Sequence, residues 1–552
     1  VYDAVSDLGT GGVLAGGNSY AEVKHNARVE AAVSAVNASL ESLALQLANQ
    51  EKATLKAYSA GGTVIEVSEK AAQVNHADTS ETLANVSGSW HATGDVTLGS
   101  SSTHELGFLV DNTKGVVTGG SSVLLENRMA GKNTLNVSGS IDAGKNLSAA
   151  ARTDLQIGAV SGKTYAVDNA VYGAVAGAEG RATSSINRET AVNVADKALM
   201  TADGDLKLSA FTKEVNDLRV RARTAGVANG VTAFNDNTIT LKNAVTIGKS
   251  GILQNRSSEH DVILSASSDE KLNLEAVGDV QGSAVGGAGA KSRNTITNEN
   301  AVTMAGGSLL NAAGDAKLYA GRDTSGANAK FDFKGYTHAY AHSLGGADSV
   351  LKDTFGLGNA LTLNGDVTAV RHIDGAATVG DWTLNETSRY WVLTSHKDAG
   401  NVKIASSAAG DKNASGFSSN DRITVNGRLT AGTQTHSRVE ISGIVDSGSN
   451  GYQISASRTD PVISVDGVKG QITTGSESVA NSYKERYEKL MSLIREYGDK
   501  GDKEDRTVLL AYRSEAQALK QKMIAQGLAV FNGDRLVSIV EKDHRGFVKV
   551  ED

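Results

Sequence analysis

Residues 237–248 read NTITLKNAVTIG and residues 294–305 read NTITNENAVTMA, so one pattern returns after 57 positions (294 − 237). A weaker copy, INRETAVNVA, precedes them at 186–195. Within the copies apolar residues alternate with polar ones, as Val245 and Ile247 do, and a period of two marks a strand that buries one face. Similar strands at a fixed spacing are typical of repeat architectures, in which each unit packs on its neighbours.

A second module follows each copy at a similar spacing. It reads GDLKLSA from Gly204, HDVILSA from His260 and GDAKLYA from Gly314. Its aspartates are therefore 56 (261 − 205) and 54 (315 − 261) residues apart. Related motifs extend the series in both directions: NVSGS at 85–89 and again 51 residues later at 136–140, GDVTL from Gly94, GKNLS from Gly144, GDVTAV from Gly365 and GDWTL from Gly380.

Short strands joined by tight corners define the predicted fold. Gly-Asp, Asn-Gly and Gly-Gly pairs, which accept positive φ, separate the strands, and no long helical pattern interrupts residues 85–475. We predict an all-β fold, a right-handed parallel β-helix (β-solenoid) with helical insertions, in which residues 85–475 form one continuous coil. We expect each period of 51–57 residues to hold two or three turns of roughly 18 to 28 residues.

A string of β-sandwich domains is the alternative fold. Such domains repeat near about 100 residues and bury a core tryptophan. Trp90, Trp382 and Trp391 lack that spacing, so the coil is favoured.

The composition also favours a thin, repetitive molecule. The chain has 552 residues with 61 Gly, one Pro, no Cys and 5% aromatic residues, which suits a narrow core of Val, Leu, Ile and Ala between stacked strands. A hydrophobic share of 40% and a net charge of −8 argue against disorder, except at the tips of Gly-rich turns. The absence of Cys excludes disulfides and thiolate metal sites. With 54 Lys and Arg against 62 Asp and Glu, and no basic stripe, nucleic acid is not an expected partner.

Two segments break the strand pattern and predict helices outside the coil. Apolar residues recur every three or four positions, on one helix face, at Val29, Val33, Val36, Leu40, Leu43 and Leu47. The same spacing occurs at Tyr483, Tyr487, Leu490, Ile494 and Tyr497 and, beyond the charged stretch 498–505, at Leu509, Tyr512, Ala516, Leu519 and Met523. The predicted division is 1–27, solenoid or strand segment; 28–57, helical insertion; 58–480, β-solenoid repeats; 481–527, helical hairpin; and 528–552, return to β structure.

Motifs for catalysis are incomplete. Some parallel β-helices cleave polysaccharides, and glycoside hydrolysis needs two carboxyl groups about 5 to 9.5 Å apart. At two or three turns per repeat, Asp205, Asp261 and Asp315 would lie roughly 10 to 15 Å apart, so we interpret them as corner residues. The segment 286–292, GGAGAKS, lacks the glycine spacing of a phosphate-binding loop, and we expect a flexible turn there. We predict no catalytic residue, no cofactor and no metal site, and leave open calcium at a corner aspartate.

One predicted strand carries a row of aromatic rings. Residues 331–342 read FDFKGYTHAYAH, which places Tyr336, His338, Tyr340 and His342 on one face and Thr337, Ala339 and Ala341 on the other. If the small residues face the core, the rings face outward, either as a recognition patch or beneath a neighbouring loop. Tyr390 and Trp391 are a second candidate of the same kind. The predicted surface-contact residues are Tyr336, Tyr340 and Trp391.

These motifs together resemble a known family. The NTIT and NAVT pattern, the GD-led strands and the turns GVANGV (226–231) and AVGGAGAKS (284–292) look like the leukotoxin-type filamentous adhesins of Gram-negative bacteria, large relatives of filamentous haemagglutinin. NARVEAAVSAV from Asn26 and SYKERYEKLMSLIREYG from Ser482 look like insertions found in that family. The resemblance covers nearly the whole chain. It implies a secreted right-handed β-solenoid, exported by a two-partner route through an outer-membrane transporter and used for attachment or surface filaments.

The expected function is a segment of a secreted filamentous surface adhesin, a rigid rod at the bacterial cell surface or outer membrane, and not an enzyme. Expected partners are a receptor on a host or neighbouring cell surface or matrix, further copies of the chain in a filament, and the transporter. A carbohydrate-active β-helix enzyme and a passive surface-layer protein are the alternatives. The chain opens Val1-Tyr2-Asp3 without an initiator Met or a signal-peptide pattern, so we expect a longer parent protein.

Overall fold

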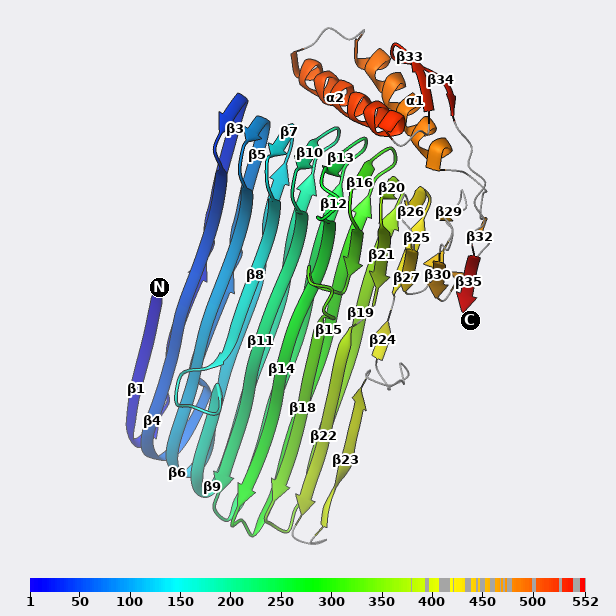
Figure 1. The fold of residues 1–552 in the computed structure, drawn as a ribbon. Helices are drawn as coiled ribbons and strands as arrows, with labels where there is room; N and C mark the ends of the chain where they lie inside the picture. The colour runs from blue at the N-terminus through cyan, green and yellow to red at the C-terminus, as the bar shows by residue number, and fades with distance from the viewer. Residues whose placement is uncertain are drawn as a thin grey trace.

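The computed structural model of the chain is an all-β parallel β-helix, as the sequence predicts (Figure 1). It describes residues 1–378 and 380–392 and, beyond these, 397–406, 417–419, 421–431, 438–442, 445–446, 452–456, 462–466, 468–469, 472–473, 479–498, 503–525, 529–539 and 547–551. The first strands are β1 (Tyr2–Ala15), β2 (Ser19–His25), β3 (Arg28–Leu40), β4 (Leu43–Asp78), β5 (Glu81–Ala92), β6 (Val96–Val137), β7 (Ser140–Ala143), β8 (Leu147–Ala159), β9 (Val167–Val194), β10 (Leu199–Ala202), β11 (Leu206–Ala225) and β12 (Ala228–Ile247).

The middle of the coil continues with β13 (Ile252–Asn255), β14 (Val262–Gln281), β15 (Val285–Met304), β16 (Leu309–Ala312), β17 (Ala316–Ala320), β18 (Lys330–Ala341), β19 (Ala347–Leu363), β20 (Asp366–Ala369), β21 (His372–Ala377), β22 (Asp381–Val392) and β23 (Lys397–Ser406). The last elements are β24 (Phe417–Ser419), β25 (Arg422–Val425), β26 (Arg428–Ala431), β27 (Arg438–Ser442), β28 (Val445–Asp446), β29 (Tyr452–Ala456), β30 (Val462–Asp466), β31 (Val468–Lys469), β32 (Ile472–Thr473), α1 (Val479–Gly498), α2 (Lys503–Ala525), β33 (Ala529–Asn532), β34 (Arg535–Ile539) and β35 (Phe547–Glu551).

One turn of the coil is wide and flat. β11 and β12, of 20 residues each, run along opposite faces and meet at a corner at Gly226 and Val227, and the short strand β13 closes the narrow edge before β14 begins the next turn. Leu206 pairs with Val262, and Asn237 pairs with Asn294. The sequence repeats therefore stack in register, but each repeat makes one turn. The prediction of two or three turns per repeat is wrong here, because the alternating pattern continues without a corner through each long strand.

The coil narrows toward its C-terminal end. β22 pairs in parallel with β18, whereas β23 runs back along β22 in antiparallel orientation. Beyond it, Arg438 pairs with Val462 and Val445 with Val468, so these turns hold 24 (462 − 438) and 23 (468 − 445) residues. The predicted turn length of 18 to 28 residues is thus correct for this part of the coil. An antiparallel partner also covers the parallel edge that the wide turns would otherwise leave open.

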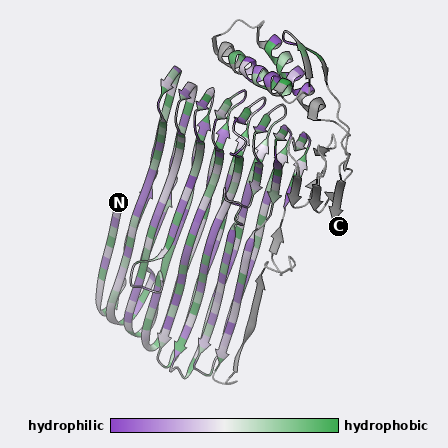
Figure 2. Cartoon of the chain, viewed as in Figure 1, coloured by the Kyte–Doolittle hydropathy of each residue, from purple (hydrophilic) through white to green (hydrophobic). Residues whose placement is uncertain are grey.

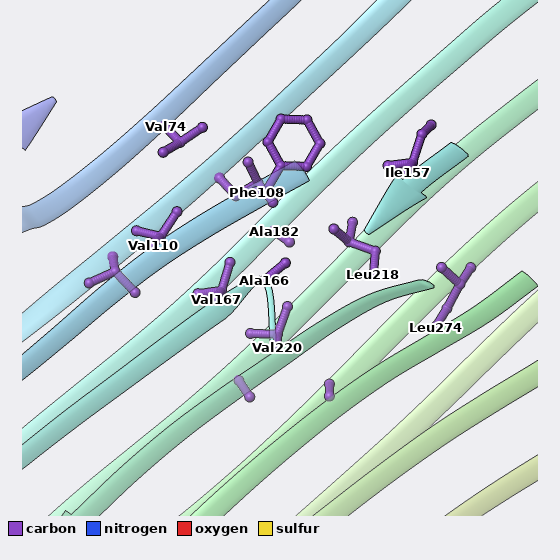
Figure 3. Close-up of a cluster of buried hydrophobic side chains, with 14 of the residues drawn as sticks. Val74, Phe108, Val110, Ile157, Ala166, Val167, Ala182, Leu218, Val220 and Leu274 are labelled. Atoms are coloured by element: carbon purple, nitrogen blue, oxygen red, sulfur yellow. The ribbon is translucent and has the colours of Figure 1, made fainter. Parts of the chain in front are cut away.

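Alternation along the strands fills the space between the two broad faces, and Figure 2 shows polar and apolar residues interleaved along each long strand. One apolar cluster, which includes Leu206 and Leu264, lies beside the short strands. A second lies toward the far corner; Val110, Val167 and Val220 belong to it and stack in register on successive turns (Figure 3). Buried polar side chains separate the two clusters, including Asn133, Thr190, Thr212, Glu214 and Asn243. The interior is therefore two apolar stripes divided by a polar belt along the coil axis.

Residues 28–57 are strands, so the predicted N-terminal helical insertion is wrong. β3 pairs in parallel with β5, from Arg28 with Glu81 onward, and β4 pairs with β6. The inward positions of β3 alternate and include alanines between the valines, and an irregularity between Ala35 and Ala38 shifts the register. That shift leaves Val36 exposed and makes an alternating strand look like a helical stripe. Pairing with later turns decides the outcome, and the coil accordingly runs from β1 onward without a helical interruption at 28–57.

The second helical segment is confirmed as α1 and α2. Figure 1 shows both helices outside the strand stack, above the short strands at its narrow edge. Tyr512 and Leu490 share an apolar cluster with Ile252 of β13 and Leu309 of β16, and Asn311 donates a 2.9 Å hydrogen bond to Glu515. The antiparallel hairpin of β33 and β34 follows, and β35 then rejoins the coil beside β30. The insertion therefore covers an edge formed by earlier turns.

Candidate functional site

A row of rings lies on the outside of one broad face. Tyr336, His338, Tyr340 and His342 alternate with Thr337, Ala339 and Ala341, whose side chains are fully buried. Successive ring centroids lie 6.2, 6.1 and 6.1 Å apart. The predicted orientation of this strand is therefore correct. We call the four rings together with Trp391 the aromatic ladder.

Trp391 extends the aromatic ladder onto the next turn. It pairs with Tyr340 in register, and the two rings stack at 4.6 Å with an interplanar angle of 16°. Its neighbour Tyr390 pairs with the buried Ala339 but stays 39% exposed. The wide turns stop at this strand, so a position that would face the core elsewhere faces the open end here. The structure thus brings Tyr336, Tyr340 and Trp391 onto one surface and places Tyr390 apart from it.

Charged groups border the aromatic ladder on the preceding turn. Glu275 and Asp279 occupy the positions beside Tyr336 and Tyr340. Tyr165, 3.4 Å from the Glu275 carboxylate, lies under the Arg221 guanidinium at 4.3 Å from its ring centroid. Burial raises the pKa values of both Glu275 and Tyr165. This surface therefore combines flat rings with bordering carboxylates and an arginine, and aromatic and arginine side chains are the types enriched at protein contact surfaces.

The corner aspartates form a second, structural ladder. The Asp205 carboxylate accepts the backbone N–H of Asp261 at 3.0 Å, and the Asp261 carboxylate accepts that of Asp315 at 3.0 Å. Asp95 and Asn146 make the same contact on earlier turns, at 3.0 and 2.9 Å. These residues occupy successive turns, so the spacing expected from the sequence, two or three turns, is wrong. Their interpretation as corner residues is supported, because each side chain satisfies a backbone donor where the strand begins.

The corner carboxylates are also neutralised by cations. Asp261 contacts Lys317 and Arg371 at 2.7 Å each, and Asp205 contacts Lys207 at 2.8 Å. Burial would raise the pKa of Asp205, but hydrogen bonds from Lys207 and the Asp261 backbone outweigh it and lower the pKa. A glycosidase acid needs a raised pKa beside an ionised partner. This ladder is built to hold ionised carboxylates instead.

A cluster of titratable side chains is buried inside the N-terminal turns. Glu51 accepts from His76 at 3.0 Å and from His104 at 2.9 Å, and Asp78 lies 3.2 Å from His104 and contacts Arg188. We call these five residues the buried ionic cluster. Ser102 contacts His104, and Asn127 contacts His76, so the imidazoles are fixed on both sides. The side chains are 98–100% buried, which requires that the charges neutralise one another.

Burial and contacts within the buried ionic cluster shift the pKa values of its members. Burial would raise the pKa of Glu51, but hydrogen bonds from His104 and His76 lower it to about 2. Burial lowers the pKa of Arg188 to about 10, against the attraction of Glu51. His25, Glu51 and Asp78 each place one possible ligand atom within 4.8 Å of the others, close enough together to hold a cation. Arg188 and two imidazoles already face the carboxylates, so the arrangement favours an ionic core over a bound metal, and the predicted absence of a metal stays a prediction.

Sequence reasoning missed the buried ionic cluster. Treating residues 28–57 as helical removed Glu51 from the strand stack. The alternation of inward and outward residues along the strands could have found it, because His25, His76 and His104 all stand at inward positions of their strands. Reasoning also misplaced 286–292, which lies within β15 rather than in a flexible turn, because it pairs with β12 on one side.

Comparison with known proteins does not assign the chain to a family. No protein-family model, curated protein or solved structure matches the chain. Neither of the two helices in the described part of the chain is long and apolar enough to cross a membrane.

Proposed function

We propose that this chain is a segment of a secreted filamentous surface adhesin and that the aromatic ladder is its contact surface. The observation that carries the proposal is that Tyr340 stacks on Trp391 on the outside of the coil. These rings do not pack in the core, because Ala339 and Ala341 fill the inward positions beside Tyr340. Large rings held outside a rigid scaffold offer contact area at little entropic cost.

The architecture supports the same proposal. The strands of each turn pair with those of the adjacent turns, so such a coil gains reach by adding turns, at about 4.8 Å per turn. The family resemblance of the sequence supports the remaining parts: export through an outer-membrane transporter, a place at the bacterial cell surface, and a receptor on a host cell, neighbouring cell or matrix.

A non-catalytic role fits the carboxylates better than the rival, a carbohydrate-active enzyme. The stacked corner aspartates hold backbone N–H groups and cations, and Asp205 has a lowered pKa. Turnover of a glycan by the purified chain, abolished by Asp261→Asn, would establish the rival.

Attachment is tested by replacing Tyr336 and Tyr340 with serine. Because both rings face outward, the variant should melt within a few degrees of the wild type yet bind cells or matrix much more weakly. Tyr20→Ser, at another partly exposed tyrosine on β2, is the matched control and should leave attachment unchanged. Unaltered attachment by the double variant would refute the contact surface, and a large loss of stability would show that the rings are structural.

A further inference from the structure

The corner joining the two broad faces carries an exposed apolar ridge along the coil axis. Leu14, Ile65, Val117, Val175, Val227 and Val285, on successive turns, are each 42–75% exposed. Leu14 pairs with Ile65. Val175 pairs with Thr118 and Ala228, so Val117 and Val227 each stand one residue before that column, and the ridge alternates between two neighbouring columns of the strand register. We call these six residues the corner ridge. Their repetition on consecutive turns sets them apart from the isolated apolar residues that any surface shows.

A groove runs beside the corner ridge. Gly120, Gly177, Gly230 and Gly287 pair in one column and form its floor, with Val67 at its N-terminal end. The groove has a volume of about 730 Å³. A Cβ added at Gly230 would meet nothing within 4 Å, so the floor is open to a side chain from outside. Without side chains, the backbone itself can be approached closely.

We infer that the corner ridge of one copy of this chain packs into the glycine groove of a second copy. Ridge and groove belong to the same turns, so both repeat about every 4.8 Å along the coil axis. Each ridge side chain of a second coil can therefore lie over one glycine of the groove floor. The two features lie side by side, and a two-fold axis would therefore seat both ridges at once in a self-complementary interface.

The apolar area of the corner ridge is large for a single surface patch. The corner ridge presents roughly 500 Å² of surface, at the upper end of what monomeric proteins expose in one patch. Two-fold pairing would bury the groove together with the ridge on each copy, and standard interfaces bury on the order of 800 Å² per partner.

Charge argues for a second copy over an anionic membrane. The groove is lined by the acidic residues Glu69, Glu179 and Asp348, and its described lining residues include no lysine or arginine, although Lys291 lies 3.9 Å from Asp348. Membrane-surface elements instead flank their apolar side with basic residues. An uncharged apolar ridge can approach this acidic wall without repulsion.

Analytical ultracentrifugation of the whole chain over a range of concentrations tests the inference. The wild type should form dimers. Val227→Lys combined with Val285→Lys charges the ridge, and Gly230→Leu fills the groove; each should weaken dimerisation at least tenfold. Both changes are at open positions, so the melting temperature should not fall. Val36→Lys, at a 91% exposed valine away from the corner, is the matched control and should dimerise like the wild type.

Three results would overturn the inference: a wild type that stays monomeric at every concentration, a dimer that survives both the ridge and the groove variants, or binding of the monomer to vesicles of neutral lipid that the ridge variant abolishes. This contact between copies goes beyond the proposed attachment function. A monomeric chain that still attaches through its aromatic ladder would refute the pairing alone, and a dimer that attaches to nothing would refute only the adhesin.

Discussion

Asn237 donates a 2.8 Å hydrogen bond from its side-chain amide to the side-chain oxygen of Asn294, which occupies the same position one turn later. Asn294 in turn donates to Asp353 at 2.7 Å on the following turn. Both amides are almost fully buried, and each donates to the side chain at the same position one turn later along the coil axis. Register is thereby stabilised by polar as well as apolar stacking, because a slip would leave buried polar groups without partners.

Asn294→Ala should destabilise the coil by about 1–3 kcal/mol, since it removes a buried amide that bridges three turns. Urea denaturation measures the change in the free energy of unfolding. Asn187→Ala, at an exposed position on β9, is the control and should change it by less than about 0.5 kcal/mol. Equal effects of the two substitutions would contradict a stabilising role for the ladder.

Asp261→Ala should also lower stability, by about 1.5–3 kcal/mol, because the Asp315 N–H, Lys317 and Arg371 lose a charged acceptor. Asp261→Asn keeps an acceptor oxygen and should cost less. The exposed Asp332→Ala is the control. Thermal melting of the three variants ranks them, and an alanine variant as stable as Asp332→Ala would show that the corner hydrogen bond contributes nothing.

Glu51→Gln should destabilise the chain at pH 7 by about 3–5 kcal/mol, because Arg188 loses a buried counter-charge and two imidazoles lose a carboxylate partner. The folded-state pKa, about 2, lies below the ordinary value of 4.5. This carboxylate therefore contributes stability above about pH 4.5 that is lost as the pH falls toward 2.

Unfolding measured from pH 7 down to pH 2 checks that sign: the gap between wild type and Glu51→Gln should close in acid. Glu105→Gln, which removes one partner of the exposed pair with Lys52, is the matched control and should follow the wild type throughout. A gap that widens in acid would contradict the assignment.

Glu214 and Glu270 stack in the polar belt and should have the opposite pH dependence. Burial raises the pKa of Glu214 to about 7, and burial together with Glu214 raises that of Glu270 well above its usual value. Each accepts an amide N–H on one oxygen, from Asn216 or Asn298, while its other oxygen lacks a hydrogen-bond partner among the described residues. A proton on that oxygen would supply a donor, so both groups should be neutral carboxylic acids in the folded chain in mildly acidic solution.

A raised folded-state pKa means that the stabilisation is complete below about pH 4.5 and is lost as the pH rises toward 7. Between pH 4.5 and pH 7.5 the wild type should therefore lose about 3 kcal/mol of unfolding free energy, and Glu214→Gln should not show this loss. Urea denaturation across this range measures it, with the exposed Glu299→Gln as control. A variant that keeps the wild-type slope would show that Glu214 ionises normally.

Much of the fold follows from local pattern. Alternation within residues 237–248, with glycines at the corners, is enough to predict strands that bury one face, and repetition predicts that equivalent positions stack. The outward row of rings at Tyr336 and Tyr340 and the helical hairpin come from the same periodicity argument. These features depend on neighbours within a few residues, which is why the sequence discloses them.

Tertiary structure alone decided the rest. A repeat near 55 residues is compatible with one wide turn or several narrow ones, and the choice depends on pairing between residues a full repeat apart, such as Leu206 with Val262. The same pairing made residues 28–57 strands against their helical spacing. The buried ionic cluster, the stacked aspartates and the corner ridge exist only because the coil closes at that length, since turn closure determines which side chains meet inside and which remain exposed at a corner.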